Sequence, residues 1–504
     1  MKRPHGSPLR GLDQNPSSPA FEGVFGRMFR TLLPAHFSNQ ALSDLAKAMI
    51  AAKEEQPASE DDIDDEENPG IDAGYTYFGQ FVDHDLTFDP SSSLQKQNDP
   101  NGLIDYRTPR FDLDNLYGRG PDDQPYLYEN DGMHFILGPL LEGNPKDPGA
   151  RGLVRNNSDP KRAIIGDPRN DENVIVSQLQ ASMLRFHNKV VDILREKHPN
   201  VRFQKIQQAV RWHYQWVVLH DFLPVIVGQD MVNSILPHLV SGKSIREDKP
   251  KLKFYSFKKE PFIPVEFSVA VYRFGHSMVR PIYRLNVGLD RKTIFAADGN
   301  ESLNGFREFP QGWAIDWDLF FNPGGAPLTG KTRIQKAYKI DTSLVNPLGD
   351  LVIAKELTGI TSLAERNLRR GKEFNLPSGQ SVARYMGVAV IGDQDLTVGK
   401  ANKDGMTPDS GQKGNIPLTS ISAEFAGNAP LWYYILAEAQ QEFKANDTPI
   451  KLGEVGGRIV AEVFIGLMLG DPHSFLSQEP DWEPFGEFGG PNFKIKDLLA
   501  SIKS

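Results

Sequence analysis

The sequence contains no cysteine among its 504 residues. Disulfide scaffolds, iron–sulfur clusters, cysteine nucleophiles and thiolate-bound metals are therefore excluded. Basic side chains are also in deficit, with 56 Lys and Arg against 65 Asp and Glu, whereas a surface that binds nucleic acid is basic. We predict that any metal is held by His, carboxylate or carbonyl groups, and that nucleic acid is not a partner.

Long apolar segments are missing too. The best run, residues 459–469, includes Glu462 and is shorter than the roughly 20 residues that a membrane span needs. No apolar stretch of secretory length follows the basic first residues. These absences predict no membrane span, and a protein that is cytoplasmic or secreted by a route without a signal peptide. They leave the oligomeric state open.

The net charge of −9 comes from one segment, because nine acidic residues lie between Glu54 and Glu67. We expect this segment to be a solvated surface loop without a catalytic part. Residues 1–20 have the composition of a disordered arm, and residues 21–70 read as an N-terminal extension that carries the acidic loop. Residues 71–504 are then one large domain.

Helical periodicity dominates the rest of the chain. Apolar residues recur at helical spacing over 177–197, 203–223, 431–445 and 456–469, and a shorter helix is expected at 41–52. Alternating strand patterns are few and there is no internal repeat. The sequence predicts a mainly α, single large helical domain with few short strands, a fold suited to a buried flat cofactor.

Residues 75–88 carry the first chemical motif. On a helix, Gln80 and His84 share a face, while Asp83 and Asp85 lie about 100° to either side of His84. A His between two Asp is often a surface or capping feature. Here the surrounding apolar residues predict burial, and two buried carboxylates need a metal, a partner or a covalent bond as compensation.

Two further motifs contain single candidates. Arg169 lies in 166–173, just before the long helix, where it could equally form salt bridges with its neighbours. His276 lies in 272–278 after Gly275, which permits close approach of another group to the backbone. A lone His on an apolar helix is also common as a satisfied core residue.

The segment 108–118 alternates oxygen-bearing side chains, among them Thr108, Asp112 and Asp114. This spacing suits calcium, a hard cation that takes six to eight oxygen ligands, although it is not an EF-hand.

Together these four segments, in order and separation, resemble the animal-type haem peroxidase family of the peroxidase–cyclooxygenase superfamily, and bacterial members in particular. The resemblance runs from about Tyr75 to Gly470, and its most specific element is residues 79–85. It implies that 71–504 is a haem peroxidase domain enclosing a b-type or ester-linked haem. The implied activity is the reduction of hydrogen peroxide, with oxidation of small organic donors or halide and pseudohalide ions through an oxoferryl intermediate, in response to oxidative stress.

The resemblance also implies a role for each motif residue on the two sides of the haem. On the proximal side these are His276 as the ligand of the haem iron, Asn367 as the partner of its other ring nitrogen, and Arg273 as the partner of a haem propionate. On the distal side they are His84 as general acid–base, Arg169 as the stabiliser of developing charge, and Gln80 as the group that orients water, peroxide or a small anion.

Covalent links and calcium follow from the same resemblance. Asp83 and Glu172 match carboxylates that can form ester bonds to haem methyls, whereas Asn173 stands where one specialised member has a Met that makes a sulfonium bond. That third link is absent here, which disfavours chloride as a donor. The implied structural calcium site consists of Asp85, Thr108, Arg110 through its carbonyl, Asp112 and Asp114.

Alternative functions remain open at this point. The superfamily also contains fatty-acid dioxygenases, which use a tyrosyl radical, and the position aligned with that tyrosine holds Ile315. A different class is suggested by residues 325–332, which fit the phosphate-binding P-loop pattern, although no apolar strand runs into the first glycine. A catalytically silent haem or calcium protein is the third alternative, and the joint presence of His84, Arg169 and His276 argues against it.

Overall fold

The computed structural model covers the whole chain and describes residues 23–53, 66–87, 104–105, 107–159, 161–257, 260–296, 302–327, 329–351, 359–401, 414–446 and 450–503. The predicted N-terminal arm and residues 54–65 of the acidic segment lie outside these described residues.

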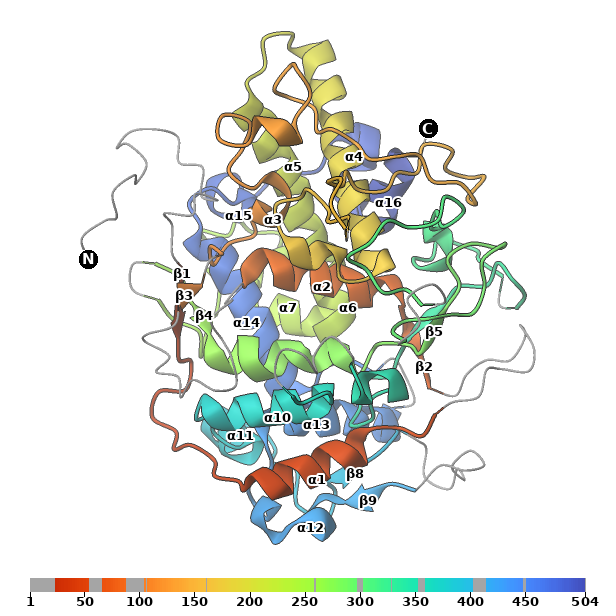
Figure 1. Cartoon of the computed structure of the whole chain (residues 1–504). Coiled ribbons are helices and arrows are strands. Elements are labelled where there is room, and N and C mark those ends of the chain that lie inside the picture. Colours follow the sequence, from red (N-terminus) through yellow and green to blue (C-terminus); the bar gives the residue numbers. More distant parts are fainter. Residues whose placement is uncertain are drawn as a thin grey trace.

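Helix α2 (Gly74–Leu86) crosses the centre of the molecule, and the other helices are arranged in layers around it (Figure 1). One side is covered by α4 (Val174–Lys197), which packs against α5 (Phe203–Val217). The other side is met by the 3-10 helix η6 (Val271–His276), followed by α13 (Leu431–Asn446), α10 (Leu363–Glu373) and α1 (Asn39–Met49). The long apolar helix α14 (Glu454–Gly470) contacts α13, η6 and α6.

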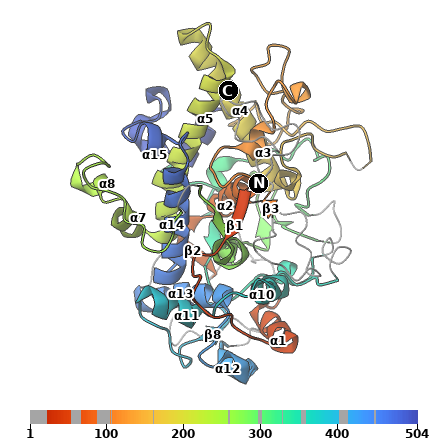
Figure 2. The ribbon, with the colours of Figure 1, turned by 90° about the vertical axis from the view of Figure 1, so that its left-hand side faces the viewer.

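Shorter elements complete the described part of the fold. The short α-helices are α3 (Asp114–Tyr117), α6 (Leu223–Val227), α7 (Gln229–Ile235), α8 (His238–Ser241), α11 (Gly379–Met386), α12 (Leu418–Ile421), α15 (Phe475–Gln478) and α16 (Ile495–Ser501). The 3-10 and π helices near the centre are η3 (Pro168–Asp171), η4 (Val218–Phe222) and η5 (Glu266–Ala270). Figure 2 shows that α7 and α8 project from one side of the molecule.

Strands are few and short, as the sequence predicts. They are β1 (Gly23–Gly26), β2 (Glu67–Asp72), β3 (Ile104–Asp105), β4 (Ile263–Pro264), β5 (Ile282–Tyr283), β6 (Lys292–Thr293), β7 (Lys336–Tyr338), β8 (Thr397–Val398) and β9 (Ile416–Pro417). They pair as one three-stranded sheet in the order β3-β1-β4 and as the pairs β2-β7, β5-β6 and β8-β9. The predicted mainly α fold class is confirmed.

The helix expected over 203–223 is interrupted near its end. α5 stops at Val217, and the π turn η4 leads into α6. Pro224 has no N–H to donate to the carbonyl four residues earlier, so the chain widens there, and the N–H of Leu223 bonds to the carbonyl of Val218 instead.

The end of the acidic segment differs from the expected surface loop. Glu66 and Glu67 are buried where β2 pairs with β7. Glu67 accepts hydrogen bonds from Arg280 at 2.8 Å and from Arg333 at 3.0 Å, and Glu66 pairs with Lys400. The prediction of a solvated loop is wrong for these two residues, because arginine and lysine side chains compensate their burial.

Residues 23–53, part of the predicted N-terminal extension, share the main core. β1 pairs with strands from two distant parts of the chain, and α1 lies along α10. Phe25, Phe29, Leu42 and Leu45 are buried in the same hydrophobic cluster as α2 and α4. This segment therefore belongs structurally to the large domain.

One histidine of α4 and two aromatic residues of α13 have structural positions. His187 bonds through its ring nitrogens to the Tyr117 hydroxyl at 2.9 Å and the Met133 carbonyl at 2.8 Å. Trp432 and Tyr433 are buried on α13. No described helix is both long and apolar enough to cross a membrane.

The P-loop interpretation is wrong. The described residues of this segment, 325–327 and 329–332, are bends and turns or lack regular structure before β7, and no described helix begins after Thr332 at this point. A P-loop needs a strand before the glycines and a helix after the Lys-Thr pair, so that backbone N–H groups surround phosphate.

His213 on α5 ties the C-terminal part of the chain to the core. Its Nδ1–H donates to the Ala209 carbonyl at 2.7 Å, and its Nε2 accepts from the N–H of Phe485 at 3.0 Å. The ring is fully buried among aromatic side chains that include Trp482 and Phe493. Burial lowers the pKa of His213 to about 4, because the neutral ring is the form that satisfies both bonds.

We expect His213 to destabilise the fold as the solution is acidified. Below pH 6.5 the unfolded chain takes up a proton at this residue and the folded chain does not until about pH 4. The free energy of unfolding should therefore fall by about 2 kcal/mol between pH 6.5 and 5 from this residue alone. Urea unfolding at both pH values should show a shallower pH dependence for His213→Phe. His36→Phe, at an exposed position, should keep the parent's dependence, and equal slopes in all three proteins would refute the assignment.

Candidate active site and candidate metal centre

Two glycines place α2 close to its neighbours. A side chain at Gly74 would lie 2.4 Å from the ring of Phe321, and one at Gly79 would lie 3.1 Å from the ring of Phe222. The hydroxyl of Tyr272 on η6 donates to the carbonyl of Gly79 at 3.1 Å. The two glycines therefore allow α2 to pack closely against Phe321 and Phe222, and the Tyr272 bond holds α2 against η6.

His84 is buried near the end of α2, and its ring is held from one side. Its Nδ1 lies 2.7 Å from the side-chain oxygen of Asn170 on η3. Among the described residues, its Nε2 has no hydrogen-bond partner. Burial lowers the pKa of His84 to about 4, with a further contribution from Arg169, so the ring is neutral near pH 7.

Arg169 lies beside His84 and is fixed by an ion pair. Its guanidinium donates to Asp167 at 2.8 Å and to the carbonyl of His84 at 3.0 Å. Although burial opposes it, the charges of Arg169 and Arg107 hold the pKa of Asp167 well below its usual range. The salt-bridge interpretation of Arg169 is therefore right, and the same ion pair keeps the cation next to His84.

Gln80, Glu172 and Asn173 form a second hydrogen-bonded group. The amide nitrogen of Gln80 donates to Glu172, and the amide nitrogen of Asn173 donates to the oxygen of Gln80 at 3.1 Å. Burial raises the pKa of Glu172 to about 7, whereas Arg169 acts in the opposite direction. Asp83 is partly buried and accepts from the Thr87 hydroxyl at 3.3 Å.

The proximal group lies on η6 and α10. The side-chain nitrogen of Asn367 lies 2.7 Å from Nδ1 of His276, whereas the predicted role of Asn367 needs its side-chain oxygen there, which a half-turn of the amide supplies. Burial lowers the pKa of His276 to about 3, and the charges of Arg273 and Arg366 add to this effect. Arg273 donates through Nε to the carbonyl of Ser268 at 2.9 Å.

Gly275 leaves its backbone accessible, and no other part of the described chain occupies that position. A side chain built there would meet no atom within 4 Å. The space beside the backbone before His276 is therefore not filled by another part of the described chain.

The two groups belong to one site. Glu172 experiences the charge of Arg169 on one side and of Arg273 on the other, and Arg366 experiences both Arg273 and Glu172. Because α2 also contacts η6, the predicted distal and proximal residues face a shared region. The structure thus brings together residues separated by nearly 300 positions in the sequence.

These residues fit a haem. The oxygen of Asn170 lies at Nδ1 of His84, which leaves Nε2 of that ring as the unprotonated atom. At His276 the Asn367 amide also lies at Nδ1, and with its oxygen turned toward Nδ1 it leaves Nε2 as the atom that can bind iron. Arg273 and Arg366 place two cations close enough to His276 to lower its pKa, and open space lies beside Gly275. The donor set also lacks thiolate, so a haem here would be held by imidazole.

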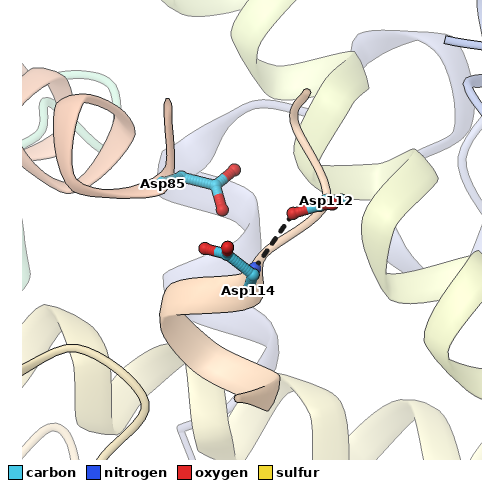
Figure 3. Close-up of side chains that lie close together, drawn as sticks. All are labelled: Asp85, Asp112 and Asp114. Atoms are coloured by element: carbon cyan, nitrogen blue, oxygen red, sulfur yellow. Dashed lines mark hydrogen bonds between the residues drawn. The ribbon is translucent and has the colours of Figure 1, made fainter. Parts of the chain in front are cut away.

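A separate carboxylate cluster lies between the end of α2 and the start of α3 (Figure 3). Asp85, Asp112 and Asp114 point toward one another, and each offers an oxygen within 4.8 Å of the others. All three are buried, and burial raises the pKa of each, most strongly for Asp85 and Asp114. Asp83 and Asp85 face different surroundings, as the helical spacing predicts.

The cluster fits a hard cation. Neither carboxylate oxygen of Asp85 has a hydrogen-bond partner in the described part of the chain. The hydroxyl of Thr108 donates to Asp112 at 2.6 Å, which places Thr108 beside the cluster, and the N–H of Arg110 donates to the Thr108 carbonyl at 2.7 Å. Three buried carboxylates repel one another unless a cation or protons neutralise them.

Some residues of the site are not evident from motif matching. Asn170, Gln180 and Arg107 contact the motif residues or their partners, although the sequence gives each no distinct role. Asn170 lies inside the Arg169 motif. Gln180 is a polar residue on the apolar face of the long helix, which is the signal that could have identified it.

Ile315 is buried in a loop against α4. Its N–H donates to Gln178 at 2.9 Å, and its carbonyl accepts from Asn144 at 2.9 Å. These contacts give it a packing role. The tyrosine nearest to the candidate haem site along η6 is Tyr272, four residues before His276.

Comparison with known proteins gives a consistent result. The sequence profile described as "Animal haem peroxidase" matches residues 91–403. Chorion peroxidase of Drosophila melanogaster is 34% identical over 234 residues, which cover 44% of this chain and 26% of that protein. Thyroid peroxidase of Mus musculus is 25% identical over 252 residues, or 47% of this chain and 24% of that protein. The chain spans about a quarter to two-fifths of the length of the first curated relatives that it matches.

Solved structures share the fold. Peroxidase A from Dictyostelium discoideum has a TM-score of 0.59 and 16% identity, with 98% of this chain and 95% of that chain covered. A fatty acid alpha-dioxygenase from Arabidopsis thaliana has a TM-score of 0.53 and 14% identity, with 95% and 76% covered.

Proposed function

This chain belongs to the animal haem peroxidase family, and we propose that it is a peroxidase that reduces hydrogen peroxide and oxidises small organic donors or halide and pseudohalide ions. The observation that supports this function best is the pair of imidazoles. An asparagine side chain lies at Nδ1 of each ring, through the oxygen of Asn170 at His84 and through the amide of Asn367 at His276, so neither Nε2 takes part in these contacts.

The proposed chemistry needs one base, one cation and one ligand from the chain. Haem bound by His276 supplies the iron that takes up peroxide and the oxidising equivalents that pass to donors. His84 would accept a proton from one peroxide oxygen and return it to the other, so that water leaves. Arg169, fixed by Asp167, stabilises negative charge as the bond between the oxygens breaks.

Removing the two histidines tests the proposal directly. His276→Ala should lose haem or its reaction with peroxide, because the ligand of the iron is gone. His84→Ala should keep haem but react with peroxide about 10²- to 10⁴-fold more slowly, as expected for loss of a general acid–base. Haem content is measured from the Soret band, and rates by stopped flow. Variants that behave like the parent would contradict the proposal.

A fatty-acid dioxygenase is the second candidate, since dioxygenases share the fold. Ile315 cannot carry a radical, and its hydrogen bonds to α4 indicate packing. The same assays should therefore include a fatty acid with oxygen as well as halide, thiocyanate and phenol donors. A peroxidase consumes peroxide with the latter donors and leaves the fatty acid unchanged.

We propose that Asp83 and Glu172 are the carboxylates that link to haem methyls. Both are partly buried, on α2 and directly before α4, and Glu172 lies within the electrostatic reach of Arg273 on the proximal side. A covalent bond would remove the energetic cost of keeping these two carboxylates charged where they are partly buried.

Acid–acetone extraction measures these links. In the parent, after exposure to peroxide, haem should stay with the protein. Asp83→Asn and Glu172→Gln should each weaken retention, and the double variant should release all of its haem. Asp167→Asn is no suitable control because Asp167 holds Arg169, so Asp192→Asn, an exposed acid on α4, is the matched variant that should behave like the parent. Free extraction from the parent would rule the links out.

We propose that Asp85, Thr108, the Arg110 carbonyl, Asp112 and Asp114 bind calcium. The cation would neutralise the three carboxylates and fasten the end of α2 to the loop before α3. Because Asp85 follows His84 directly, the ion would also fix the position of the proposed acid–base. Its role is structural.

Calcium should raise the thermal stability of the parent, by about 2.7 kcal/mol at a calcium concentration one hundred times the dissociation constant. Asp85→Asn should lose this dependence and should be more stable than the parent in a chelator, because one repelling charge is gone. Differential scanning fluorimetry with calcium, magnesium and chelator measures both effects. If the melting temperature of the parent protein is the same with and without chelator, the proposed calcium site is refuted.

A further inference from the structure

We infer that Asn170 and Gln180 are positioning residues that decide which ring nitrogen of His84 carries the proton. The inference deepens the proposed peroxidase function, on which its kinetic consequence rests. Neither residue reaches the region that faces His276. Both act through hydrogen bonds behind the imidazole.

The three side chains form a chain of hydrogen bonds that ends on a backbone carbonyl. His84 Nδ1 lies 2.7 Å from the oxygen of Asn170, whose amide nitrogen donates to the oxygen of Gln180 at 2.8 Å. The amide nitrogen of Gln180 then donates to the carbonyl of Asn115 at 3.5 Å. Asn115, Asn170 and Gln180 are all fully buried.

The last carbonyl fixes the direction of the whole chain. A carbonyl oxygen can only accept, so Gln180 must present its NH₂ group to Asn115 and its oxygen to Asn170. Asn170 must then present its NH₂ group to Gln180 and its oxygen to His84. An oxygen at that place requires a proton on Nδ1, which leaves Nε2 unprotonated and able to take a proton from a substrate.

Among the described residues, the side chains of Asn170 and Gln180 have no further hydrogen-bond partner that would favour the opposite orientation. The hollow on the other side of Gln180 is lined mainly by apolar residues, including Leu116, Ile164 and Leu184. Asn115 itself is anchored, because its side-chain nitrogen donates to the carbonyl of Phe81 on α2 at 3.1 Å. The chain of bonds thus links α2, α3, η3 and α4 around a single imidazole.

The opposite tautomer would be inactive in the proposed reaction. A proton on Nε2 would leave no lone pair there to accept the peroxide proton. The unprotonated Nδ1 would then face the side-chain oxygen of Asn170. Two hydrogen-bond acceptors would meet in a buried place with no proton between them. The structure therefore selects the reactive form through residues that never touch the substrate.

The test uses the full-length protein labelled with ¹⁵N-histidine, in the ferrous carbon monoxide state, with His84→Gln to assign the resonance. Nitrogen NMR separates protonated from unprotonated ring nitrogens. Gln180→Met keeps the volume of Gln180 but removes its hydrogen bonds, so the Asn170 amide is free to turn. Asn170→Asp cannot reverse its polarity, since both carboxylate oxygens accept. Asn188→Leu removes a comparable asparagine of α4, which bonds only to the backbone of Phe135.

In the parent we expect the proton of His84 on Nδ1. Gln180→Met should shift it toward Nε2 and slow the reaction with peroxide about 10- to 100-fold, without loss of haem. Adding Asn170→Asp to Gln180→Met should restore the proton to Nδ1, whereas Asn188→Leu should change neither tautomer nor rate. A parent with the proton on Nε2, or a Gln180→Met protein with the parent's tautomer, would overturn the inference. If the protein binds no haem, the proposed function fails, and the tautomer is still decided on the protein as purified.

Discussion

Backbone groups fix the polarity of the side chains around α2, and the arrangement of the site depends on this constraint. At the start of α4, the N–H groups of Ile175 and Val176 donate to the oxygen of Asn173. Only its NH₂ group is then left for Gln80. A buried amide that points the wrong way cannot form replacement hydrogen bonds to water. Each buried amide must therefore present the donor or acceptor that its fixed neighbour needs.

Ion pairs join the carboxylate cluster to the candidate active site. Arg107 contacts Asp114 of the carboxylate cluster at 3.3 Å and Asp167 at 2.6 Å, and Asp167 in turn holds Arg169. The carboxylate cluster at the end of α2 is thus connected to Arg169, the cation beside His84. Buried charges of this kind are stable only as a complete set, because removing one leaves its partner uncompensated.

Helical periodicity was sufficient to predict the long helices and the mainly α fold, because the apolar stripes of 177–197 and 456–469 are packed as such. It could not predict the π turn before Pro224 or the burial of Glu67, which depend on a missing N–H and on two distant arginines. The family resemblance, rather than the spacing of any one motif, pointed to the residues that the structure brings together. Their supporting partners escaped it because hydrogen bonds such as that between Asn170 and Gln180 leave no repeating pattern in the sequence.

Asn173 illustrates how a departure from a family pattern gains a physical meaning. From the sequence, it indicates only that a Met-based haem link is absent. In the structure it caps α4 and orients Gln80, so that the amide nitrogen of Gln80 faces Glu172. A Met at this position could do neither, since it has no strong hydrogen-bonding group. The residue that excludes one covalent bond therefore organises the polar contacts of the carboxylate proposed to form another.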